Sequence, residues 1–85
     1  MRTMSEIQSK LARFIAEKIM KQPKRELNPD QKLISSGLID SFSLVDVGLF
    51  VEDEFGVRID DVDLTVELMD TLVLMEQAVV ARRNA

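Results

Sequence analysis

Apolar side chains recur every three to four positions in three separate stretches, and this spacing constrains the fold more than any other feature of the chain. The stretches are residues 3–22, 41–55 and 71–82. An α-helix completes a turn in about 3.6 residues, so the apolar side chains of each stretch fall on one face. The sequence therefore predicts three helices that pack on one another through these faces.

Local signals mark where the predicted helices begin and end. Thr3 and Glu6 have the spacing of a capping box at the start of the first helix. Pro23 prevents that helix from continuing. Gly56 is a typical stop after the second helix.

Residues 23–40 and 57–70 connect the predicted helices. The first connection is long for so small a chain, and such loops are often functional. The residues that we expect to anchor it to the core are Leu27, Leu33, Ile34 and Leu38. In the second connection we expect a short helical turn at Val66–Met69, and either Asp70 or Thr71 can cap the last helix. The predicted fold class is all-α: a small four-helix bundle of three main helices and one short helix, with a long loop between the first and second.

The chain contains neither cysteine nor histidine among its 85 residues. The first absence excludes disulfides and thiol nucleophiles, and the second removes the commonest general base and metal ligand. A conventional hydrolase or zinc enzyme is therefore not expected. The net charge of −4 argues against nucleic-acid binding, and no apolar run approaches the roughly 18 residues of a membrane span. We expect one small domain over residues 1–85, monomeric and cytoplasmic.

Asp60, Asp61 and Asp63 form an acidic cluster that could suggest a calcium site. An EF-hand loop beginning at Asp61 would need glycine at its sixth position, which is Val66. We therefore predict no metal site and expect these acids to lie in a solvated turn.

The second predicted helix has two distinct faces. The face that we assign to the core carries Leu44, Val47, Val51 and Phe55. Asp46 and Asp53 fall on another arc with Phe42 and Leu49 beside them, and Phe50 falls opposite the core. Exposed apolar residues next to acids are typical of a partner-binding face. The alternative is scattered apolar surface, which is ordinary in folded proteins.

Asp40 and Ser41 stand at the start of that helix. Both residue types are common helix caps, so one interpretation is purely structural. The other makes Ser41 a chemical handle, because a helix N-terminus stabilises an attached anion. The chain has no G-x-S-x-G motif and no histidine to act as a base. If Ser41 reacts, another protein must activate it.

Three short motifs stand at helix boundaries: GLIDS at residues 37–41, VEDEFGVRI at residues 51–59 and MDTL at residues 69–72. Together they resemble the acyl carrier proteins of the phosphopantetheine-binding family. The length of residues 23–40 is also similar to the long first loop of that family. The resemblance covers nearly the whole chain and implies the same helical fold.

The resemblance implies a role for each matching residue. Ser41 matches the serine that a phosphopantetheinyl transferase (holo-ACP synthase) esterifies with 4′-phosphopantetheine from coenzyme A, and Asp40 matches the acid that positions it. The residues that partners would contact are Phe42, Asp46, Leu49, Glu52 and Asp53. The chain would not be an enzyme. It would carry an acyl or aminoacyl group as a thioester, from an acyl- or aminoacyl-activating ligase to a downstream synthase or transferase.

The sequence around Ser41 departs from that of fatty-acid-synthesis carriers, which usually read LGADSLD where this chain reads GLIDSFS. Ser43 stands in place of a usual acid. GLIDS is more similar to specialised carriers of the aminoacyl, D-alanyl, polyketide or nonribosomal peptide types. The open alternatives are a carrier of one of these cargoes and, in a different class, an unmodified helical interaction module in which Ser41 is only a cap.

Overall fold

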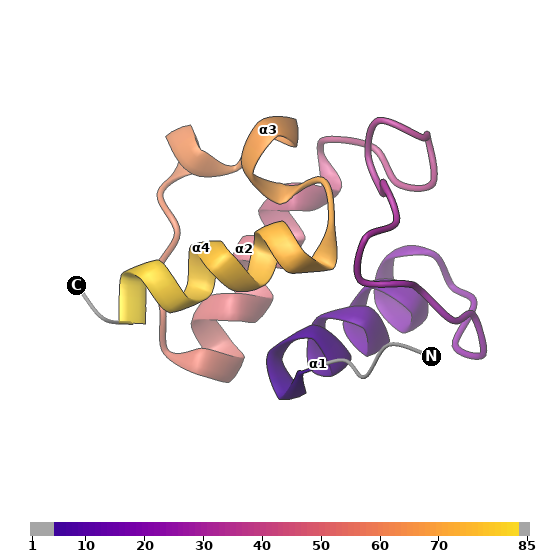
Figure 1. The fold of residues 1–85 in the computed structure, drawn as a ribbon, viewed down its shortest axis with the longest axis horizontal. Coiled ribbons are helices and arrows are strands. Elements are labelled where there is room, and N and C mark those ends of the chain that lie inside the picture. The colour runs from indigo at the N-terminus through magenta and orange to yellow at the C-terminus, as the bar shows by residue number, and fades with distance from the viewer. Residues whose placement is uncertain (1–4, 84–85) are drawn as a thin grey trace.

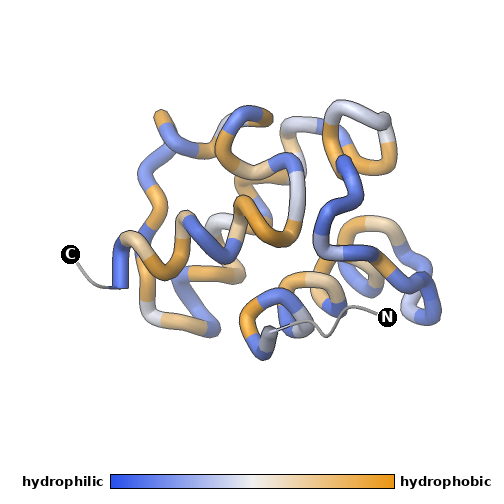
Figure 2. The backbone as a smooth tube through the Cα atoms, in the orientation of Figure 1, coloured by the Kyte–Doolittle hydropathy of each residue, from blue (hydrophilic) through white to orange (hydrophobic). Residues whose placement is uncertain are grey.

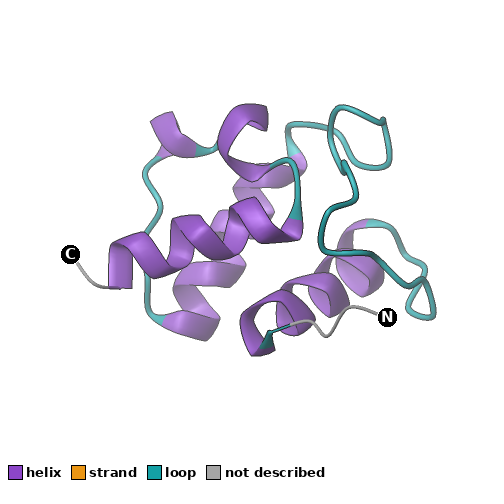
Figure 3. Ribbon diagram, in the orientation of Figure 1, coloured by secondary structure: helices purple, strands orange, loops and turns teal. Residues whose placement is uncertain are grey.

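A computed structural model describes residues 5–83 of the chain. Its α-helices are α1 (Glu6–Phe14), α2 (Ser43–Phe55), α3 (Val66–Met69) and α4 (Leu72–Arg83). Figure 1 shows α4 in front of α2, with α1 beside them and the long loop on the side away from the C-terminus. A π-helical turn and a 3₁₀ turn complete the regular structure, and no strand occurs within residues 5–83 (Figure 3). The predicted all-α fold of three main helices and one short helix is confirmed.

Ser5 caps the first helix. Its hydroxyl accepts a hydrogen bond from the N–H of Gln8 at 3.1 Å, which satisfies one of the free donors at the helix start. Ser5 itself has an extended backbone with ψ 166°, so α1 begins at Glu6. The prediction that the helix starts at residue 3 was therefore wrong, and the capping role predicted for Thr3 lies outside the described residues.

The first helix widens into a π-helical turn, Ile15–Ile19, before it ends. The N–H of Met20 donates to the carbonyl of Ile15, five residues back, at 2.8 Å. Such a turn holds an extra residue, which rotates the following side chains away from the α-helical pattern. Lys21 then adopts a left-handed φ of +59°, and the helix has ended before Pro23, as predicted.

The core collects the apolar faces of α1, α2 and α4 together with residues of both connections. The side chains that are most fully buried are Leu11, Ile15, Leu33, Leu44, Val47, Val51, Met69, Leu72, Met75 and Val79. Figure 2 shows hydrophobic segments alternating with hydrophilic ones along each of these helices. Each buried side chain of this size contributes about 1.5–3 kcal/mol, so these faces supply most of the driving force for folding.

No helix within residues 5–83 combines the length and apolarity that a membrane crossing requires.

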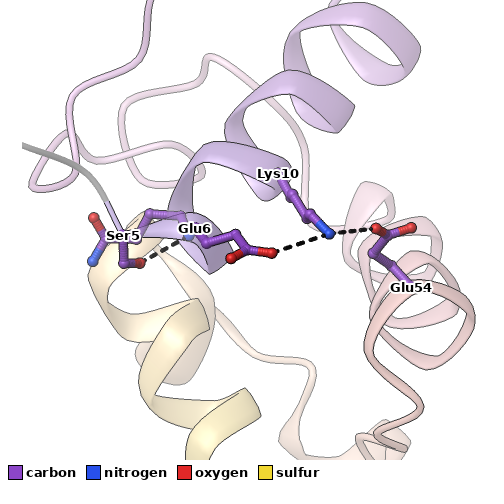
Figure 4. Close-up of polar contacts among 5 residues, drawn as sticks. Ser5, Glu6, Lys10 and Glu54 are labelled. Atoms are coloured by element: carbon purple, nitrogen blue, oxygen red, sulfur yellow. Dashed lines mark hydrogen bonds and ion pairs between the residues drawn. The ribbon is translucent and has the colours of Figure 1, made fainter.

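Side chains of α1 and α2 also meet at the edge of the core. Phe14 stacks on Phe50 with ring centroids 4.3 Å apart. Lys10 donates to Glu54 at 2.9 Å and pairs with Glu6 at 3.4 Å (Figure 4), and the hydrogen bond to Glu54 raises the pKa of Lys10. The sequence placed Phe50 on an exposed side opposite the core. It is half-buried instead, because α1 covers that side of α2.

Candidate functional site

Ser41 lies in the turn that leads into α2, and it is exposed to solvent. The chain is anchored on both sides of it. Ile39 is 5% exposed and Leu44 is 1% exposed. The core therefore holds the short segment between these anchors at a fixed place on the surface.

Asp40, and not Ser41, closes the turn that leads into α2, whose own N-cap residue, Phe42, forms no side-chain cap hydrogen bond. The Oδ1 atom of Asp40 accepts hydrogen bonds from the N–H of Ser43 at 3.1 Å and from its hydroxyl at 3.3 Å. The backbone carbonyls of Asp40 and Ser41 accept from the N–H groups of Ser43 and Leu44 at 3.1 and 3.2 Å, which is 3₁₀ spacing. Because this tighter turn comes first, α2 begins at Ser43, and the predicted start at residue 41 was wrong.

The Ser41 hydroxyl is left free by this arrangement. Within residues 5–83 the hydroxyl forms no hydrogen bond, and neither the Ser41 nor the Phe42 N–H donates one. These N–H groups stand at the positive end of the α2 dipole. An anion attached at Ser41 would therefore meet unused donors.

The loop that leads to α2 is held by one buried carboxylate, that of Asp70. Its Oδ1 atom accepts from the N–H groups of Leu33, Ile34 and Ser35 at 3.2, 2.8 and 3.0 Å. Its Oδ2 atom accepts from the Ser35 hydroxyl at 2.7 Å. The N–H of Ile39 then donates to the carbonyl of Leu33 at 3.0 Å and closes the loop. Asp70 thus fixes the base of the loop that ends at α2.

These contacts determine the charge of Asp70. Burial by itself would raise its pKa, since the residue is only 5% exposed. The hydrogen bonds from Ser35 and from the N–H of Ile34, with the nearby charge of Lys32, outweigh burial and hold the pKa of Asp70 below its ordinary value. Asp70 is therefore ionised at neutral pH.

The sequence suggested Asp70 or Thr71 as the cap of α4, and the structure assigns that role to Thr71. The Thr71 hydroxyl accepts from the N–H of Leu74 at 3.0 Å. The role of Asp70 in the loop was missed, because its partners are distant in the chain and no local pattern points to them. The sequence offered one signal for this role: Asp70 stands next to Thr71, which can cap α4 by itself.

Ser41 has no group nearby that could remove its proton. The chain has no histidine, and the adjacent acid, Asp40, is engaged with Ser43. If Ser41 accepts a group, another protein must therefore activate its hydroxyl.

Among residues 5–83 no cluster of three or more potential metal ligands occurs. Of the acids predicted to lie in a solvated turn, Asp60 and Asp61 are exposed, whereas Asp63 is half-buried and pairs with Arg82.

The residues predicted to contact partners are all exposed, and they lie at the start of α2 or along it. Phe42 is 85% exposed and Leu49 is 61% exposed. Asp46, Leu49 and Asp53 line one groove whose other wall belongs to the first helix. The sequence placed four residues side by side, and three of them, Asp46, Leu49 and Asp53, share this groove. Phe42 and Glu52 are exposed outside this groove.

The fold and the site together define a class of protein: a small helical bundle that displays an unengaged serine before a helix and leaves the chemistry to other proteins. Over residues 9–79 the chain matches the family described as "phosphopantetheine attachment site". The chain belongs to this family.

Two curated relatives have acyl-carrier names. The "acyl carrier protein" of Thermotoga maritima is 39% identical over 64 residues, which are 75% of this chain and 78% of that protein. The "meromycolate extension acyl carrier protein" of Mycolicibacterium smegmatis is 37% identical over 62 residues, which are 73% of this chain and 62% of that protein. No solved structure gives a significant match.

The chain is accordingly an acyl carrier protein and not an enzyme. It carries acyl groups on a covalently attached 4′-phosphopantetheine and interacts with a phosphopantetheinyl transferase and with pathway enzymes. The predicted family, carrier function and cofactor are confirmed. The free hydroxyl and N–H groups at the start of α2 fit this group, because the hydroxyl can be esterified and the N–H groups can face the phosphate. The attached group supplies the thiol that a chain without cysteine lacks.

Proposed function

We propose that Ser41 is the residue to which 4′-phosphopantetheine is attached. The observation that carries this proposal is the free Ser41 hydroxyl, which is exposed while the neighbouring Asp40 closes the turn into α2. Esterifying a serine used as a cap would weaken its Oγ atom as the acceptor for the helix N–H. Ser41 has no such bond within residues 5–83, so its modification leaves the helix start intact.

The chain contributes the nucleophile and its position, and the transferase contributes the rest. The Ser41 Oγ atom forms the new bond to phosphorus, and the adenosine-containing part of coenzyme A leaves with the other phosphate. The proton of the hydroxyl passes to a base of the transferase, because this chain offers none. The hydrogen bonds from Ser43 to Asp40 fix the turn before α2. Ser41 therefore enters the active site of the transferase in one orientation.

Intact-mass measurement tests the assignment. We would incubate the chain with coenzyme A and a promiscuous phosphopantetheinyl transferase, and we expect a gain of one phosphopantetheine. Ser41→Ala should gain nothing. Ser36→Ala, which removes another exposed serine of the same loop, should be modified like the wild type. Modification of Ser41→Ala, or no modification of the wild type beside a carrier that is modified, would overturn the proposal.

Residues near Ser41 form the surface that we propose for pathway enzymes: Phe42, Asp46, Leu49, Glu52 and Asp53. Exposed apolar side chains among acids support this assignment. Acids at such a surface speed the encounter with basic partners more than they tighten the complex. The tethered arm then presents the thioester to each active site at high effective concentration.

We further propose a specialised cargo, such as an aminoacyl, D-alanyl, polyketide or peptidyl group, because GLIDSFS lacks the acid that follows the motif in fatty-acid carriers. A matching ligase would load the arm, and a synthase or transferase would accept the cargo. Loading the modified chain with candidate activating enzymes and measuring the added mass would identify the cargo class. The single domain, the monomeric state and the cytoplasmic location stay predictions.

A further inference from the structure

The segment of chain before Ser41 folds back on itself. The N–H of Gly37 donates to the carbonyl of Ile34 at 3.0 Å, and the N–H of Ile39 donates to the carbonyl of Leu33 at 3.0 Å. Gly37 adopts a left-handed φ of +85°, a conformation that glycine reaches without strain. Ser41 follows only two residues after Ile39. A shift of this loop is therefore passed to Ser41 through a very short piece of chain.

One charged group from outside the loop, the Asp70 carboxylate, holds the loop in place. Three consecutive N–H groups, those of residues 33–35, donate to its Oδ1 atom. Consecutive N–H groups that converge on one point form a concave anion-binding nest. The hydroxyl of Ser35 donates to the other oxygen of the same carboxylate. The nest is thus filled by a side chain of the chain itself, 35 positions beyond Ser35.

The backbone adds two hydrogen bonds between the long loop and the junction of α3 and α4, which lies beside it in Figure 1. The N–H of Leu33 also donates to the carbonyl of Asp70 at 2.8 Å, and the N–H of Val73 donates to the carbonyl of Pro29 at 3.2 Å. Neither bond uses the Asp70 side chain. Replacing that side chain should therefore loosen residues 34–35 without detaching the whole loop.

The helix that follows Ser41 is held by other contacts. Leu44, Val47 and Val51 of α2 are buried in the core, and none of them belongs to the loop that Asp70 holds. A change of the Asp70 side chain should therefore leave α2 and its exposed side chains as they are. Recognition of the carrier and placement of its serine thus depend on different parts of the chain.

We propose that Asp70 is a positioning residue for the attachment of 4′-phosphopantetheine: by holding residues 33–35, it orients the segment that brings the Ser41 hydroxyl to the transferase. The inference rests on the attachment at Ser41 proposed above. Asp70 acts through the loop and not on the hydroxyl, since its side chain bonds to residues 33–35. Misplacing a reacting group by about 1 Å can slow a reaction about 100-fold, so a small shift of Ser41 is enough to matter.

Steady-state phosphopantetheinylation tests this, with the carrier as the varied substrate and the transferase in limiting amount. Asp70→Asn keeps the shape and one acceptor oxygen but loses the charge, and Asp70→Ala loses both acceptors. We expect kcat to fall by about threefold for Asp70→Asn and by about tenfold for Asp70→Ala. The KM for the carrier should change by less than about twofold, because the α2 surface is unaltered.

The matched control is Thr71→Val, a substitution at the neighbouring buried residue. It removes the hydroxyl that accepts from the N–H of Leu74, so it weakens α4 without touching the loop. It should keep the kcat of the wild type. Partial unfolding alone would lower the concentration of folded carrier, which raises the apparent KM and leaves kcat unchanged. Circular dichroism at the assay temperature measures the folded fraction of each variant.

Amide proton–nitrogen correlation spectra of the unmodified full chain give a second measurement that needs no transferase. Both Asp70 variants should shift the signal of Ser41, whereas Thr71→Val should leave it in place. An unchanged kcat in Asp70→Ala, an equal fall of kcat in Thr71→Val, or an unmoved Ser41 signal in both Asp70 variants would each overturn the inference. Attachment at Ser41 is tested separately by the mass of Ser41→Ala, so failure of that proposal is distinguishable from failure of this one.

Discussion

Asp70 accepts hydrogen bonds from a loop whose backbone lies in neither a helix nor a strand. Its carboxylate accepts four hydrogen bonds from residues 33–35. Buried N–H groups need partners, and an ionised acceptor forms stronger hydrogen bonds than a neutral one. The Asp70 side chain, just before α4, therefore holds the part of the long loop at residues 33–35.

We predict that Asp70→Ala lowers the free energy of unfolding by about 1–3 kcal/mol, because it leaves the part-buried N–H groups of Ile34 and Ser35 without an acceptor. The N–H of Leu33 keeps its hydrogen bond to the Asp70 carbonyl. Urea unfolding followed by circular dichroism measures this. Asp61→Ala removes an exposed acid instead and should change the value by less than about 0.5 kcal/mol. Similar small effects of both substitutions would contradict the anchoring role of Asp70.

The contribution of Asp70 should depend on pH. Its pKa is lower in the folded chain than the ordinary value, so the unfolded chain binds the proton more readily. The stabilisation is complete above the ordinary pKa of about 3.9 and is lost as pH falls through the folded pKa. The difference in unfolding free energy between the wild type and Asp70→Asn should stay constant from about pH 7 to 5 and shrink below about pH 4. A difference that grows on acidification would contradict this assignment.

At the scale of elements, α2 depends on its two ends for different reasons. At its start, Asp40 satisfies the Ser43 N–H. At its end, Gly56 adopts a left-handed φ of +67° and donates to the carbonyl of Glu52 at 3.0 Å. Only glycine reaches this conformation without strain.

At the start of α2, one residue, Asp40, stabilises the helix, and the next, Ser41, is the proposed attachment site. Asp40→Ala should lower the free energy of unfolding by about 1 kcal/mol, the usual value of a lost cap. Ser41→Ala should change it by less than about 0.5 kcal/mol, since the Ser41 hydroxyl forms no hydrogen bond within residues 5–83. Thermal and urea unfolding of the two variants side by side make the comparison. A larger loss for Ser41→Ala would mean that Ser41 is the cap after all.

The end of α2 gives an independent prediction. Gly56→Ala should destabilise the chain by about 1–2 kcal/mol, because a Cβ atom strains the left-handed conformation. Nothing lies within 4 Å of where that atom would be, so steric crowding adds no further penalty. Calorimetry measures the shift in melting temperature. An unchanged or higher melting temperature would show that the helix can end in another way.

Periodicity sufficed to predict α2 and α4, because their apolar faces are set by residues close together in the chain. The short helix occurs at Val66–Met69 as predicted, and Gly56 ends α2 as predicted. The exact starts of α1 and α2 were missed locally, and two further missed features join distant segments. Asp70 binds a loop far from it in the chain, and Phe50 is covered by Phe14 of another helix. Such contacts leave no local pattern that a single sequence could reveal.

At the scale of the whole molecule, the surface charge and the apolar core have different effects on how the chain meets its partners. The net charge of −4 should favour encounters with basic partners. The exposed acids of α2 concentrate part of this charge near Ser41, whereas the core faces inward and contributes no charge. The surface therefore governs how fast partners arrive, and the core governs whether Ser41 is correctly placed when they do.

Asp46→Lys should slow phosphopantetheinylation of the chain, and the slowing should be greater at low salt, where surface charges are less screened. Initial rates at two ionic strengths, with the transferase in limiting amount, measure this. Glu67→Lys makes the same change of net charge on α3 and should slow the reaction less. Equal slowing by both substitutions would assign the effect to total charge and not to the α2 surface.

The lack of a hydrogen bond at the Ser41 hydroxyl within residues 5–83 also bears on repeated rounds of loading and delivery. Attaching or removing a group at this atom breaks no hydrogen bond of the described fold. The forms with and without the attached group would then share one backbone arrangement at the start of α2. An enzyme that distinguishes them must recognise the arm and its load, because the scaffold beneath would be the same in every round of delivery.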